Sequence, residues 1–173
     1  MAEHEVGQKM LLAFAGKQFT PQMQAALRDY RPAGVTLFRH LNVDHPAQVQ
    51  ALCADLQRAA RELGLPPLLI AADQEGGQLM AVGEGVTPLP GNMALGAAGS
   101  EALAEEAGTV LGRELAAMGV NVDYAPVCDV NINPRDRVIG SRSFGEDPQA
   151  VGRLAAAVIR GLQGAGVAAA GKQ

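Results

Sequence analysis

Short apolar runs alternate along this chain with longer segments in which apolar residues recur every three or four positions. A short uninterrupted apolar run is typical of a strand buried on both faces, whereas the longer spacing is typical of a helix with one buried face. The pattern predicts strands at residues 10–15, 35–38, 68–72, 122–125 and 167–170. It predicts helices over residues 21–30, 46–63 and 100–118, and a last helix that begins at Asp147 and Pro148.

A glycine stands between each predicted helix and the strand that follows it. These glycines are Gly34, Gly64, Gly119 and Gly166, and a glycine in this place commonly ends a helix in the left-handed conformation. Repetition of strand, helix, glycine and strand is typical of βαβ units, which build a parallel sheet. Both a doubly wound sheet and a (β/α)8 barrel fit this repetition. The first strand-to-helix turn, residues 16–19, lacks a glycine-rich phosphate loop, so the pattern favours the barrel.

The length of the chain limits how much of a barrel it can form. A complete (β/α)8 barrel takes roughly 250 residues, whereas this chain has 173 residues and shows about five strands. We therefore expect residues 1–173 to be the N-terminal part of a single barrel domain. Its unpaired sheet edge would favour self-association or aggregation. The segment 82–99, rich in glycine and proline, is expected to be a loop.

Charge and composition exclude some classes of partner. A formal net charge of −4 argues against broad electrostatic binding to nucleic acid or to acidic membranes. The apolar run at 10–15 is too short for a membrane span, and the acidic residues before it do not fit a signal peptide. Cys53 and Cys128 form neither a disulfide framework nor a metal-ligand spacing. We expect a soluble, cytoplasmic protein in which both cysteines are buried.

Two polar clusters follow predicted strands, where α/β proteins place ligand-binding groups. The first is Asp73 and Glu75, directly after the strand at 68–72; the simpler interpretation is that these acids only shape a glycine-rich turn. The second, residues 131–148, contains Arg142 and should reach the same face as Asp73. Its guanidinium suits recognition of hydroxyls, carboxylates or phosphates. For an arginine taken in isolation, however, a pair with Glu146 or Asp147 at the start of the last helix is the favoured interpretation.

Five motifs taken in order resemble glycoside hydrolase family 3, and most closely its bacterial β-N-acetylhexosaminidases that recycle cell-wall sugars. The resemblance runs from about Leu37 to the C-terminus, and the motifs are residues 71–77, 87–90, 122–130, 139–148 and 171–172. It implies a (β/α)8 barrel and a retaining glycosidase that needs no cofactor or metal. The implied substrate is a carbohydrate with terminal β-linked N-acetylglucosamine or glucose.

The resemblance assigns roles to three residues of this chain. Asp73, Arg142 and Lys172 match residues that bind the non-reducing sugar, and charge-assisted hydrogen bonds to its hydroxyls suit that role. The acid/base histidine and the nucleophilic aspartate of the family fall beyond residue 173. No catalytic residue is therefore assigned here, and we expect no glycosidase turnover from the 173-residue polypeptide alone.

The chain departs from the family pattern at three positions. Gln78 and Ala81 stand where the family often has arginine, and the arginine at the position of Ala81 is a ligand contact in the close relatives. Gln173 stands where a histidine is expected. These departures leave the subsite preference open.

Three hypotheses from other classes remain at this point. Lys172 at a strand end could form a Schiff base with a carbonyl substrate. The half-barrel could instead be a non-catalytic sugar-binding or interaction module. Finally, oxygen ligands from four acids could hold a hard cation, namely those of Asp73, Glu75, Asp123 and Asp129.

Overall fold

The computed structural model of the chain describes residues 6–133 and 135–172. Its main sheet has five strands, β1 (Leu11–Leu12), β2 (Gly34–Leu37), β3 (Leu69–Ala72), β6 (Val122–Asp123) and β7 (Ala168–Ala169). All four neighbouring pairs are parallel, and the spatial order β1-β2-β3-β6-β7 follows the chain. A doubly wound sheet would reverse this order at a switch point. The prediction of a barrel-type arrangement is therefore confirmed, and within the described residues the barrel is not closed.

The four predicted helices are present and begin at the predicted residues. They are α2 (Pro21–Tyr30), α4 (Pro46–Glu62), α6 (Glu101–Met118) and α7 (Pro148–Gly164). Side chains of Thr20, Ser100 and Asp147 accept hydrogen bonds from backbone N–H groups in the first turns of α2, α6 and α7. These bonds satisfy donors that a helix start otherwise leaves unpaired. Each helix therefore starts where its capping residue and its apolar pattern agree.

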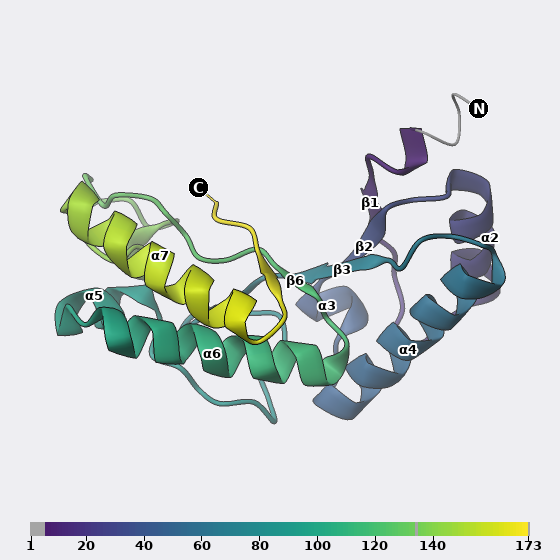
Figure 1. The fold of residues 1–173 in the computed structure, drawn as a ribbon, viewed down its shortest axis with the longest axis horizontal. Helices are drawn as coiled ribbons and strands as arrows, with labels where there is room; N and C mark the ends of the chain where they lie inside the picture. Colours follow the sequence, from purple (N-terminus) through teal and green to yellow (C-terminus); the bar gives the residue numbers. More distant parts are fainter. Residues whose placement is uncertain (1–5, 134, 173) are drawn as a thin grey trace.

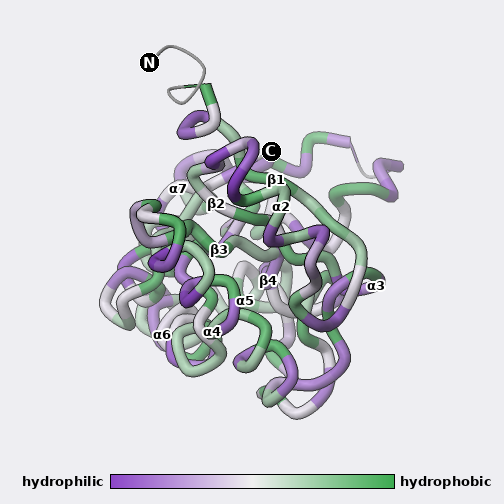
Figure 2. The backbone as a smooth tube through the Cα atoms, turned by 90° about the vertical axis from the view of Figure 1, so that its right-hand side faces the viewer, coloured by the Kyte–Doolittle hydropathy of each residue, from purple (hydrophilic) through white to green (hydrophobic). Residues whose placement is uncertain are grey.

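The helices divide into two groups around the sheet. Helices α2 and α4 lie on one side of the molecule and α6 and α7 on the other, with β2, β3 and β6 between them (Figure 1). The hydrophobic stretches of β2 and β3 run through the middle of the molecule in Figure 2. The almost completely buried aliphatic side chains include those of Val35, Leu37, Leu52, Leu56, Ile70, Leu115 and Leu162.

The segment expected to be a single loop, residues 82–99, contains a helix. Helix α5 covers Asn92–Ala98, and Gly99 ends it in the left-handed conformation with φ of 62°. Within it, Gly96 lies so close to the carbonyl group of Phe144 that a Cβ would collide with it. Gly96 was one of the glycines that led to the prediction of a loop. In the structure it lies within a helix and permits close contact between α5 and the backbone at Phe144. The four-residue helix α3 (Arg39–Asn42) was also not predicted.

Three of the four junction glycines adopt the predicted conformation. Gly64, Gly119 and Gly166 have φ values of 63°, 83° and 87°. The prediction is wrong for Gly34, because Arg31 takes the left-handed conformation there, with φ of 47°. Gly34 instead lies within β2, where a Cβ would collide with the carbonyl oxygen of Leu69 on β3. Its missing side chain permits the close approach of the two strands.

The cysteines differ in burial. Cys53 is buried on α4, as expected, but Cys128 is exposed. Cys128 follows the buried Val127, which forms an isolated parallel bridge with Lys172. In residues 6–133 and 135–172, no helix combines the length and apolar character that a membrane span requires.

Glycines bring α6 and α7 into close contact. A Cβ at Gly161 of α7 would collide with the carbonyl oxygen of Glu105 on α6, and one at Gly108 would collide with that of Val158. Backbones therefore touch at this crossing with no side chain between them.

We predict that Gly161→Ala destabilises the fold by about 1–3 kcal/mol, because the two helices must move apart. The matched control is Gly152→Ala on the same helix, where an added Cβ meets nothing within 4 Å. That change should stabilise the helix by roughly 0.5–1 kcal/mol. Urea unfolding of a protein extended through the rest of the barrel, hereafter the extended chain, measures both effects. Equal effects of the two substitutions would contradict the packing argument.

Candidate functional site

A hairpin that begins directly after β3 carries the acidic cluster. Strand β4 (Gln74–Gly76) pairs antiparallel with β5 (Leu79–Met80). Gly76 at the end of β4 and Gly77 in the turn have positive φ values. The side chain of Gln74 is buried and forms hydrogen bonds with both the N–H and the carbonyl of Val82. These bonds fix the hairpin in place, so the carboxylates on either side of Gln74 have defined positions.

Glu75 lies at the centre of an ion-pair cluster. Arg142 donates two hydrogen bonds to it, from Nε to Oε2 and from Nη2 to Oε1, both 2.8 Å long. Lys172 Nζ lies 2.6 Å from Glu75 Oε1 and also contacts Asp73 Oδ1. Lys172 is held beside this region because its backbone pairs with the segment at Val127. Segments that follow β3, β6 and β7 therefore meet in one cluster.

The structure brings all three predicted sugar-binding residues together. Asp73, Arg142 and Lys172 are linked through Glu75, so the expectation that Arg142 reaches the same face as Asp73 is confirmed. The alternative pair of Arg142 with an acid at the start of α7 is wrong. The central role of Glu75 was not predicted from the sequence. Its position two residues after Asp73 was a usable signal, because residues two apart in a strand lie on the same face.

Burial and charge oppose each other at Glu75, whose side chain is only 2% exposed. Burial alone would raise the pKa of Glu75, but hydrogen bonds from Arg142 and Lys172 outweigh this effect and hold the pKa below its ordinary value. Burial would likewise lower the pKa of Lys172, yet its contacts with Asp73 and Glu75 raise it overall. The lysine is therefore a charged donor. A Schiff-base nucleophile needs a neutral amine, so this geometry argues against that hypothesis.

Asp123 lies fully buried beside the cluster, at the end of β6. Its Oδ1 accepts a hydrogen bond of 2.9 Å from the backbone N–H of Gln74. Its Oδ2 has no hydrogen-bond partner among the described residues. Burial raises the pKa of Asp123 to about 8, so the carboxyl group is protonated at neutral pH. It supports the hairpin backbone without adding a charge.

The hard-cation hypothesis finds no support in the part of the chain that the structure describes. No group of three or more His, Cys, Asp or Glu side chains is placed there to hold a metal ion. Two of the proposed ligands, Asp73 and Glu75, contact the ammonium of Lys172 instead.

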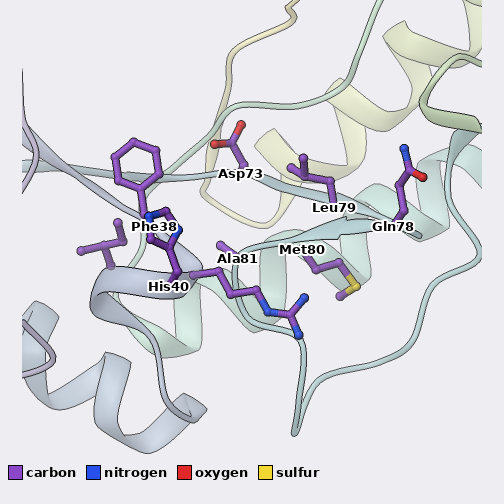
Figure 3. A pocket seen from close by; sticks show the side chains of 9 residues that line it. Phe38, His40, Asp73, Gln78, Leu79, Met80 and Ala81 are labelled. Atoms are coloured by element: carbon purple, nitrogen blue, oxygen red, sulfur yellow. The ribbon is translucent and has the colours of Figure 1, made fainter. Parts of the chain in front are cut away.

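A pocket of about 240 Å³ adjoins Asp73. Figure 3 shows Phe38 and His40 coming from the segment after β2, and Gln78 and Ala81 from the hairpin. The full lining is Leu37, Phe38, Arg39, His40, Asp73, Gln78, Leu79, Met80 and Ala81. Two of the departures from the family pattern, Gln78 and Ala81, thus lie at this pocket. The third, Gln173, falls outside the described residues.

Comparison with known proteins identifies similar chains. Residues 1–173 match the family model described as the glycosyl hydrolase family 3 N terminal domain. The beta-hexosaminidase of Pseudomonas aeruginosa (strain LESB58) is 39% identical over 164 residues, which cover 94% of this chain and 47% of that protein. The beta-hexosaminidase of Thiobacillus denitrificans is 40% identical over 169 residues, which cover 94% of this chain and 45% of that protein. The chain therefore spans about half the length of these curated relatives.

Solved structures agree with the sequence comparison. A glycoside hydrolase family 3 β-N-acetylglucosaminidase from Paenibacillus sp. str. FPU-7 matches with a TM-score of 0.94 and 44% identity, covering 98% of this chain and 32% of that one. NagZ from Neisseria gonorrhoeae, solved in complex with N-trifluoroacetyl-D-glucosamine, matches with a TM-score of 0.82 and 33% identity. That match covers 91% of this chain and 47% of the Neisseria chain.

We predict that Glu75→Gln destabilises the extended chain by roughly 3 kcal/mol, because it removes the buried charge that neutralises Arg142 and Lys172. Glu101→Gln is the matched control. Glu101 forms only exposed pairs with Arg153 and Arg160, so its loss should cost at most about 0.5 kcal/mol. Urea unfolding at pH 7 gives both values. A Glu75→Gln protein as stable as the control variant would show that the cluster does not depend on this carboxylate.

A second prediction concerns pH. The pKa of Asp123 rises from its ordinary value of about 4 in the unfolded chain to about 8 in the fold. Between these values the folded state binds more protons, so this group makes the free energy of unfolding fall as pH rises. Asp123→Asn cannot ionise and should gain stability relative to the parent protein from pH 5 to pH 8. Parallel stability curves, measured by urea unfolding at both pH values, would contradict the assigned pKa.

Proposed function

This chain belongs to glycosyl hydrolase family 3, and we propose that it forms the sugar-binding, N-terminal part of a single barrel domain with β-N-acetylhexosaminidase activity. The observation that carries the proposal is the convergence of Asp73, Arg142 and Lys172 from three separate segments into one cluster. The cluster adjoins a pocket to which Asp73 contributes. Relatives of this chain are beta-hexosaminidases, which supports an N-acetylated sugar as substrate.

The cluster has the chemistry that a sugar requires. Sugar hydroxyls both donate and accept hydrogen bonds, and bonds to charged groups are about twice as strong as neutral ones. Asp73 is 29% exposed, Lys172 24% and Arg142 16%, so each presents part of its side chain to a ligand. Asp73 would accept hydrogen bonds from hydroxyl groups, while Lys172 and Arg142 would donate them.

The buried carboxylate of Glu75 holds the two donors before the sugar arrives. It is linked to both cations and fixes their side chains, so little conformational freedom is lost on binding. A rigid set of charges placed where hydroxyls will lie is also the arrangement that orients a sugar for reaction. Glu75 itself is too buried to contact the substrate and acts through its partners.

The bond-breaking groups would come from the part of the barrel outside residues 1–173. In a retaining glycosidase, one carboxylate attacks the anomeric carbon while an acid protonates the leaving oxygen, and water then releases the sugar from the enzyme. We propose that residues 1–173 bind and orient the non-reducing sugar for this sequence. A cytoplasmic location and a role in cell-wall sugar recycling rest on the family resemblance, and self-association through the open sheet edge rests on the incomplete barrel.

We expect the extended chain to hydrolyse an aryl β-N-acetylglucosaminide faster than the matching β-glucoside, and the 173-residue chain to hydrolyse neither. Asp73→Ala should lower kcat/KM of the extended chain by about 100-fold, since a charged hydrogen-bonding partner of the sugar is lost. Asp29→Ala is the control, because Asp29 is exposed on α2 and pairs with Arg28. Release of the aryl group measures all of these rates.

Each outcome assigns a different function. Saturable binding of N-acetylglucosamine without turnover by the extended chain would favour the sugar-binding module. Turnover by the 173-residue chain that is lost in Asp73→Ala would show that residues 1–173 contain the catalytic groups. Turnover unaffected by Asp73→Ala would remove Asp73 from the site.

A further inference from the structure

Arg39 and Asp73 are the one arginine and the one acidic residue that line the pocket beside the cluster. They follow neighbouring parallel strands, and the register pairs Leu37 at the end of β2 with Ala72 at the end of β3. Asp73 comes one residue after this pair and Arg39 two residues after it. The two charges therefore emerge at the same edge of the sheet, a guanidinium from one strand end and a carboxylate from the next.

The guanidinium of Arg39 lies against the hairpin. A Cβ added at Gly83 would lie 2.5 Å from its Nη2 and 2.9 Å from its Cζ, so the group occupies the space that a larger residue at position 83 would fill. Ala81, which also lines the pocket, contributes only a methyl group. The small side chains of this segment thus leave room for an arginine that comes from a different strand end.

No hydrogen bond or ion pair engages the Arg39 side chain within residues 6–133 and 135–172. Arg142, by comparison, donates to both oxygens of Glu75. The fork of N–H donors on Arg39 is therefore available to a ligand in the pocket. A neutral polyol is a suitable partner, because each hydroxyl offers lone pairs and adds no charge to be desolvated.

We propose that Arg39 donates hydrogen bonds to a hydroxyl of the same terminal sugar that Asp73 binds, and so determines specificity at this end of the site. This proposal rests on the proposed function. The family resemblance places a ligand-binding arginine at position 81, where this chain has alanine. Here Arg39, from the segment after β2, lines the same pocket as Ala81, so a guanidinium donor is retained at the pocket although its position in the sequence has changed.

The test compares Arg39→Ala with the parent protein in the extended chain, using an aryl β-N-acetylglucosaminide and its 4-deoxy and 6-deoxy analogues. We expect kcat/KM on the full sugar to fall by about 10- to 100-fold, the effect of losing a charged hydrogen bond. For the parent protein, kcat/KM should be lower by a similar factor on one of the two deoxy analogues than on the full sugar. For Arg39→Ala, kcat/KM on that analogue should be nearly the same as on the full sugar. Arg58→Ala, which removes an exposed arginine of α4 paired with Asp55, should behave like the parent.

The outcomes separate this proposal from the one on which it rests. An active parent protein with unchanged activity in Arg39→Ala would overturn only the role of Arg39. Equal losses on both deoxy analogues in parent and variant would also overturn it, because Arg39 would then act without contacting a hydroxyl. If the parent has no turnover, the dissociation constant for N-acetylglucosamine replaces kcat/KM as the readout. Arg39→Ala should then bind the sugar about 10- to 100-fold more weakly than the parent. Absence of both turnover and binding would overturn both proposals.

Discussion

The site depends on one interaction, the contact of the buried Glu75 carboxylate with both Arg142 and Lys172. Two cations brought together without this carboxylate would repel each other, and a buried carboxylate without them would lose its charge. The three side chains come from segments that follow β3, β6 and β7, so the contact forms only when these strands are in register. Correct pairing of these strands therefore also brings the residues of the cluster together.

Such a cluster contributes more to geometry than to net stability. Removing charges from water costs several kcal/mol for each ion, and the mutual attraction of a buried pair often only offsets that cost. What the cluster supplies is fixed position, since Glu75 holds a guanidinium by two bonds and an ammonium by one. Asp123 also helps to fix the cluster. It accepts a hydrogen bond from the backbone N–H of Gln74, and burial raises its pKa so that it adds little charge.

The sequence predicted features that depend on neighbouring residues and missed those that depend on tertiary contacts. The starts of α6 and α7 were predictable because Ser100 and Asp147 cap them locally. Asp73, Arg142 and Lys172 were found through their places at strand ends and the family resemblance, and the structure brings them together. Helix α5 and the placement of Arg39 were not predictable, because each depends on contacts between segments distant in the chain. The β4–β5 hairpin is local, but its two strands are only three and two residues long. The central position of Glu75 required knowing that Arg142 folds back across 67 residues to reach it.

The central claim is that Asp73, Arg142 and Lys172 form a prepared binding surface for one sugar. A crystal structure of the extended chain with N-acetylglucosamine tests this claim most directly. The account predicts that sugar hydroxyls lie within hydrogen-bonding distance of all three side chains, while Glu75 keeps its bonds to Arg142 and Lys172. A sugar bound elsewhere, or a cluster that must break its ion pairs to admit the sugar, would contradict it.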